Sequence, residues 1–187
     1  MNTGQEGPAA MDIITTFAQG KFPKEIMYNP GSPGYTATWQ GIIKAAEEAN
    51  EPGSFTAFIG YEWTSLVNGA NMHRNIVFRD NADKASQVEP FTNYPPGSSN
   101  PRDLWKWMPN VEEKTGAELL AIAHNGNLSN GRMFPIIESF NGKRIDREYA
   151  ENRVRWAPLY ETTQIKGDGV THPFLSRNGE FGNFERW

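Results

Sequence analysis

The chain has 187 residues, the length of one domain or of a large piece of one. Its net charge of −4 argues against a general nucleic-acid binder, which carries a basic face. The chain has no cysteine, which excludes disulfides and thiolate metal sites, and it has no apolar run near the ~20 residues of a membrane span.

The periodicity of apolar residues predicts an alternation of helices and strands. Residues 1–35 show little pattern, and we treat them as a segment separate from a domain over residues 36–187. In chain order we expect a helix at 38–50, strands at 55–61 and 73–79, a helix at 100–116, a strand at 119–123, a helix at 146–157 and a strand at 159–165. This order favours an α/β layer with parallel strands. Pro109 predicts a kink or a break in the helix that contains it.

Polar residues stand where the predicted strands begin or end. His124 follows the apolar run 119–123, and it opens a loop in which Gly126 and Gly131 indicate unusual backbone angles. Glu62 directly follows one strand, and His73 opens the next. Each could simply be a polar residue at a strand end. The last strand runs into a glycine turn with further polar residues, namely Lys166, Asp168 and His172.

All three histidines of the chain, together with Glu62, occupy such positions. Imidazole nitrogen with carboxylate oxygen is the usual ligand set for zinc, manganese or iron in hydrolases. The ligands are far apart in sequence, as expected when they come from separate strand ends of a barrel. Other chemistries find no support, because the chain has no Gly-x-Ser-x-Gly elbow, no Walker loop and no dinucleotide glycine fingerprint.

Several stretches resemble a known bacterial family. They are residues 58–65 (FIGYEWTS), 73–74 (HR), 123–131 (AHNGNLSNG), 156–161 (WAPLYE) and 164–173 (QIKGDGVTHP). They are similar to a family catalogued only as domain of unknown function 3604, over about residues 39–187. That family in turn resembles a branch of the polymerase-and-histidinol-phosphatase (PHP) superfamily of metal hydrolases.

The resemblance implies an α/β fold, an incomplete distorted β/α barrel (PHP-like, TIM-type) with long loops, whose metals lie at the strand ends. The superfamily motif of a glutamate followed by a histidine matches Glu62 and His73, and a strand-end histidine matches His124. His172 matches a motif whose role stays open between ligation and contact with a ligand or substrate. The superfamily's His-x-His, Asp-His and Asp-x-His motifs are absent. We therefore expect a central fragment of a longer enzyme.

The implied activity is that of a metal-dependent hydrolase, a phosphoesterase that uses a metal-activated water on a small anionic substrate. Manganese, zinc or iron would be held by Glu62, His73 and His124. The residues expected to act in catalysis are Glu62, His124, His172 and Asp168, and those expected to contact substrate are Arg74, Asn125, Asn127 and Lys166. Two alternatives stay open: a non-catalytic aromatic-rich binding module built on the six tryptophans, and a fragment inactive without its missing ends. The sequence leaves compartment and oligomeric state undecided.

Overall fold

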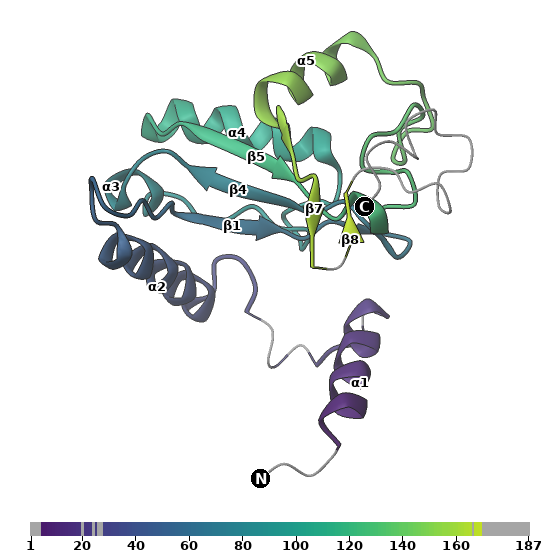
Figure 1. The fold of residues 1–187 in the computed structure, drawn as a ribbon, viewed down its shortest axis with the longest axis horizontal. Coiled ribbons are helices and arrows are strands. Elements are labelled where there is room, and N and C mark those ends of the chain that lie inside the picture. The colour runs from purple at the N-terminus through teal and green to yellow at the C-terminus, as the bar shows by residue number, and fades with distance from the viewer. Residues whose placement is uncertain (1–4, 20, 24, 26–27, 166, 170–187) are drawn as a thin grey trace.

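The computed structural model describes residues 5–19, 21–23, 25, 28–165 and 167–169. Its helices are α1 (Glu6–Ala18), α2 (Pro33–Ala49), α3 (Ala82–Ala85), α4 (Pro101–Thr115), the 3-10 turn η2 (Gly126–Leu128) and α5 (Arg147–Trp156). Its strands are β1 (Gly60–Trp63), β2 (Leu66–Val67), β3 (Ala70–Asn71), β4 (Arg74–Phe78), β5 (Leu119–Ala123), β6 (Leu159–Tyr160), β7 (Thr163–Gln164) and β8 (Gly167–Asp168). Figure 1 shows α1 standing apart from the sheet.

The central sheet has the order β1-β4-β5-β6, and it is mostly antiparallel. Only β5 and β6 pair in parallel, so the expected layer of parallel strands is wrong. The reason is the short β2–β3 hairpin between β1 and β4, which turns at Asn68 and Gly69 with φ of 50° and 78°. Such a two-residue turn returns the chain antiparallel without a crossover helix. The described residues form a mixed α/β fold around a partly open sheet, and they form no closed barrel.

One face of the sheet carries the hydrophobic core. Burial alternates along β4 and β5, so that every second side chain points to this face. Its cluster joins side chains of β1, β4 and β5 to residues of α2, α4 and α5: Trp63, Ile76, Phe78, Leu119, Ala121, Trp39, Ile43, Leu104, Trp105, Met108, Tyr149 and Trp156. The helices of this cluster therefore lie on one side of the sheet.

The opposite face of the sheet is more exposed to solvent than the core face. Its side chains alternate with those of the core and are exposed or half-buried: Glu62, Asn75, Val77, Leu120 and Ile122. Glu62 lies opposite Asn75 on β4, and Asn75 lies opposite Ile122 on β5. This face is therefore where groups at the strand ends remain accessible.

Several element boundaries differ from the prediction. Helix α2 begins at Pro33, earlier than expected, because the Ser32 side chain accepts a hydrogen bond from Tyr35 N at 3.3 Å and caps the helix. Of the kink or break expected at Pro109, the break is wrong, because α4 continues through this residue to Thr115. Pairing with β4 starts only at Gly60, so the predicted strand 55–61 is displaced toward Trp63. The predicted strand 159–165 is two short strands, β6 and β7.

Two predicted features of α4 are confirmed. Asn100 caps its start by accepting a hydrogen bond from Arg102 N at 3.0 Å, and Gly116 ends it in the left-handed region at φ 69°. Among the described residues, no helix combines the length and the apolar character needed to cross a bilayer.

Candidate metal centre

The antiparallel pairing of β4 with β5 brings the two histidines of the described chain together. His73 directly precedes β4 and His124 directly follows β5, and the neighbouring residues Arg74 and Ala123 lie opposite each other. His124 N donates to His73 O at 3.3 Å, which continues the ladder by one step. Glu62 lies near the end of β1, on the same face as both histidines. A strand start and two strand ends therefore meet at one edge.

The three side chains converge on one oxygen. Glu62 Oε1 lies 2.8 Å from His73 Nδ1 and 3.2 Å from His124 Nε2. One ligand atom from each residue falls within 4.8 Å of the others. The histidine side chains are 14% and 11% exposed, whereas that of Glu62 is 43% exposed. We call these residues the Glu62 triad, and it is accessible to solvent from the glutamate side.

The donor set of the Glu62 triad fits a divalent transition metal. Two imidazole nitrogens and one carboxylate oxygen suit zinc, manganese or iron. Bonds of about 2.1 Å place the ligand atoms of one ion roughly 3–4 Å apart, so small shifts would accommodate an ion here. His124 Nε2 is buried and makes no hydrogen bond among the described residues, despite its short contact with Glu62. A buried polar atom in this state is uncommon, and a bound ion is one partner that would satisfy it.

Asn125 supports His124 from behind. It is 2% exposed, and its backbone has the left-handed angles φ 58° and ψ 31°, which asparagine tolerates better than most residues. Its side-chain Nδ2 lies 3.0 Å from His124 Nδ1, on the far side of the ring from Glu62. Gln164 Nε2 in turn donates to Asn125 Oδ1. The Asn125 backbone N donates to Glu161 Oε2 at 3.4 Å.

Sequence reasoning missed Glu161 and Gln164. The parallel pairing of β6 with β5 places Ala123 opposite Tyr160 and so brings Glu161 to the backbone of Asn125, while Gln164 lies on the next strand, β7. The sequence pattern that could have indicated them is the segment 160–164, in which polar residues follow a short strand, as they do after β5. It could not be used without knowing which strand is the neighbour of β5.

Gly126 has a different role from the one expected. Its φ is not positive; Asn125, Asn130 and Gly131 take the positive angles in this loop. A Cβ at Gly126 would lie 1.7 Å from the hydroxyl oxygen of Tyr160. The glycine is therefore required because Tyr160 approaches the backbone closely.

A comparison with protein families shows to which family the chain belongs. The family described as "Protein of unknown function (DUF3604)" matches residues 1–187. The chain belongs to the DUF3604 family. Comparisons of this DUF3604 chain with curated proteins and with solved structures gave no match.

The structure of this DUF3604 chain does not bring Arg74 to the triad. Arg74 is fully buried on the core face, between the rings of Trp63 and Trp105 at 5.7 and 5.8 Å from their centroids. Its Nη1 donates to Met72 O at 2.8 Å, and burial lowers its pKa to about 10. This position, facing away from Glu62, gives no support to the expected contact with substrate.

The remaining predicted residues divide into two groups. Asn127 lies on η2, in the turn that follows His124 and Asn125. Lys166 and His172 lie outside the described residues. Asp168 belongs to β8, but its side chain is also outside the described part of the chain. The predictions for these last three side chains therefore stay predictions.

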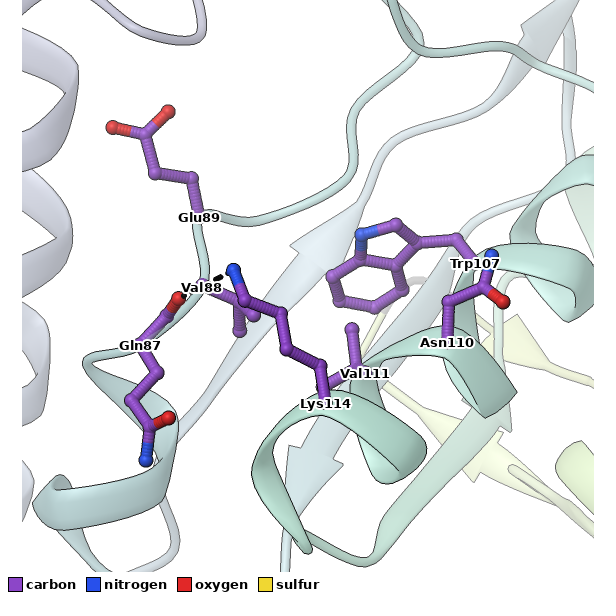
Figure 2. Close-up of a pocket in the computed structure, with 7 residues that line it drawn as sticks. All are labelled: Gln87, Val88, Glu89, Trp107, Asn110, Val111 and Lys114. Carbon is purple, nitrogen blue, oxygen red and sulfur yellow. Dashed lines mark hydrogen bonds between the residues drawn. The ribbon is translucent and has the colours of Figure 1, made fainter.

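A groove of about 450 Å³ lies elsewhere on the molecule, between α4 and residues 87–89. Figure 2 shows the Lys114 amine of α4 directed at Gln87, Trp107 beside it on the same helix, and the Glu89 carboxylate pointing away from both. Its charged groups already have partners: Glu89 accepts from Gly31 N at 2.7 Å, and Lys114 donates to Gln87 O at 3.4 Å. None of its lining residues comes from the Glu62 triad, so it is separate from the candidate metal centre.

Proposed function

We propose that this DUF3604 chain carries the divalent-metal centre of a PHP-type hydrolase, with Glu62, His73 and His124 as ligands. The observation that carries the proposal is the convergence of one carboxylate oxygen and two imidazole nitrogens within 4.8 Å from three strands. The activity we propose is hydrolysis of a phosphate ester, and this choice of substrate follows the resemblance to the superfamily. Manganese, zinc or iron is the proposed metal.

Each triad residue has a distinct part in this proposal. When bound, a divalent ion lowers the pKa of water and polarises a phosphoryl oxygen. Glu62 supplies the anionic oxygen on the exposed side, where a small anionic substrate can approach. His73 and His124 supply neutral nitrogen ligands, held at a fixed separation by the β4–β5 ladder. Asn125 orients the His124 ring through its contact with Nδ1.

The alternative of an aromatic-rich binding module has less support. Trp39, Trp63, Trp105 and Trp156 are at most 5% exposed and belong to the core. Trp107 is half-buried and stacks on Phe91 with ring centroids 5.9 Å apart. Five of the six tryptophans thus serve packing in whole or in part. Trp187 lies outside the described residues.

The test is the metal content of the purified chain after incubation with each ion and removal of the excess. We expect stoichiometric metal in the unmodified chain and its loss in Glu62→Gln and His124→Ala. Glu118→Gln is the matched control, because Glu118 is an exposed carboxylate just before β5, paired with Arg79 at 2.7 Å. Full metal content in His124→Ala, or none in the unmodified chain with any of the three ions, would contradict the proposal. A metal-loaded chain is then assayed against phosphate monoesters and diesters.

A further inference from the structure

The contact behind His124 determines where the ring proton lies. An amide nitrogen is always a donor, so the Asn125 Nδ2 at 3.0 Å requires His124 Nδ1 to accept. A neutral imidazole has one N–H and one lone pair. With the lone pair at Nδ1, the proton is on Nε2, the atom that faces Glu62 Oε1 at 3.2 Å. In this arrangement Nε2 has no lone pair to offer a metal.

The orientation of Asn125 is itself held by Gln164. Because Gln164 Nε2 donates to Asn125 Oδ1, the oxygen of Asn125 is turned toward β7 and its nitrogen toward His124. A half-turn of the Asn125 amide alone would place its Nδ2 against Gln164 Nε2, two donors facing each other. The two amides are therefore coupled, and both must turn for either to turn.

We propose that Asn125 and Gln164 form a two-amide lock on the tautomer of His124, which opens by a joint half-turn when a metal binds. After the turn Asn125 Oδ1 accepts from His124 Nδ1–H, and Asn125 Nδ2 donates to Gln164 Oε1. The ring keeps a single proton, which moves from Nε2 to Nδ1, and Nε2 gains the lone pair that coordination requires. A metal-bound histidine donates its other N–H to an acceptor, and Asn125 becomes that acceptor. The inference rests on the proposed metal centre, with Asn125 and Gln164 as positioning residues.

The variant that tests the lock is Gln164→Glu. A carboxylate only accepts, so it draws Asn125 Nδ2 toward itself and turns Asn125 Oδ1 to His124. The lock is then set in its open state without any change to His124 or Asn125. Ile165→Glu is the matched control, because it adds the same charge at the next residue, which is fully exposed. Gln164→Met removes the donor without adding charge.

The first measurement uses metal-free protein. Long-range ¹H–¹⁵N spectra distinguish the two imidazole tautomers, and the spectrum of His124→Ala assigns the His124 signal. We expect the proton on Nε2 in the unmodified chain and in Ile165→Glu, on Nδ1 in Gln164→Glu, and a mixture in Gln164→Met. A proton on Nδ1 in the unmodified chain, or an unchanged tautomer in Gln164→Glu, would overturn the lock.

The second measurement is the affinity for Zn²⁺ alone, by competition with a chelator. We expect Gln164→Glu to bind about tenfold more tightly than the unmodified chain, the size of effect known for groups that orient a ligand. Ile165→Glu should stay within about twofold. Equal tightening in both variants would overturn the lock, because charge alone would then explain it. Absence of Zn²⁺ binding in every variant would instead contradict the metal centre, while the spectra still decide the tautomer.

Discussion

Two clusters of charged and polar side chains in this chain differ in how their polar atoms are partnered. The Arg102 network consists of Arg102, Glu138 and Asp146. Arg102 Nε donates to Glu138 Oε2 at 2.7 Å, and its Nη2 donates to Glu138 Oε1 and to Asp146 Oδ1, both at 2.8 Å. The Glu62 triad instead gathers a carboxylate and two imidazoles around one oxygen.

The difference lies in whether the cluster contains its own permanent cation. In the Arg102 network the guanidinium supplies the donors that the carboxylates accept, and it holds the pKa of Glu138 below its usual range. The network ties the start of α4 to the start of α5 and to the segment that precedes it. In the Glu62 triad a buried ring nitrogen makes no hydrogen bond among the described residues. A cluster in which cationic donors face carboxylate acceptors stabilises a fold. A cluster of carboxylate and imidazole atoms without such a cation is suited to binding a metal ion.

The largest expected effect is on the free energy of unfolding, to which the Arg102 network should contribute more than the Glu62 triad. Arg102→Met should lower the free energy of unfolding by about 3 kcal/mol, because it removes the cation beside the buried carboxylate of Glu138 and leaves Asn141 Nδ2, at 3.1 Å, as its side-chain donor among the described residues. Glu138 is 4% exposed, so solvent cannot replace the lost donors. Urea unfolding measures the change. Metal content should not change, and its loss together with stability would show that the two clusters are not independent.

The next largest effect is a loss of metal binding without a loss of stability. His73→Ala should weaken Zn²⁺ binding by more than about 100-fold, since it removes a ligand rather than a group that orients one. The free energy of unfolding of the metal-free chain should change by less than about 1 kcal/mol, because the ring contacts a partly exposed carboxylate. Chelator competition and urea unfolding on the same samples provide the two values. A large loss of stability without loss of Zn²⁺ would assign His73 to the fold.

Acid should weaken the Arg102 network selectively. Because the pKa of Glu138 is lower in the folded chain than its ordinary value of 4.5, its contribution to stability is complete above that value. The contribution is lost as the pH falls through the lower, folded pKa. The difference in unfolding free energy between the unmodified chain and Glu138→Gln should therefore be constant near pH 7 and narrow below about pH 4. A difference that does not narrow would contradict an ionised Glu138 as the partner of Arg102.

The smallest effect concerns a second buried arginine. Among the described residues, the guanidinium of Arg74 donates from Nη1 to Met72 O, while its Nε and Nη2 have no hydrogen-bond partner. Arg74→Met keeps most of the volume between Trp63 and Trp105 and removes a buried charge. Unfolding free energy should stay the same or rise by up to about 1 kcal/mol. A loss comparable to that of Arg102→Met would contradict this expectation and would show that the contacts of the guanidinium with the two indole rings stabilise the fold.

Much of the local structure could be predicted from the residues alone. The capping asparagine and the closing glycine define α4, and the apolar run of residues 119–123 defines β5. The three triad residues were also found, because polar groups at strand boundaries are a local signal. Pro109 shows the limit of such signals, since the helix continues through it.

The sequence by itself determined which side chains could bind a metal, since ligand chemistry belongs to the residue type. Only the tertiary structure decided that they meet, because strand order and direction depend on the β2–β3 hairpin and on pairing between distant segments. The same pairing turned Arg74 into the core and His73 toward Glu62, since adjacent residues of a strand face opposite sides. It also placed Gln164 against Asn125, a contact across 39 positions that no local pattern records.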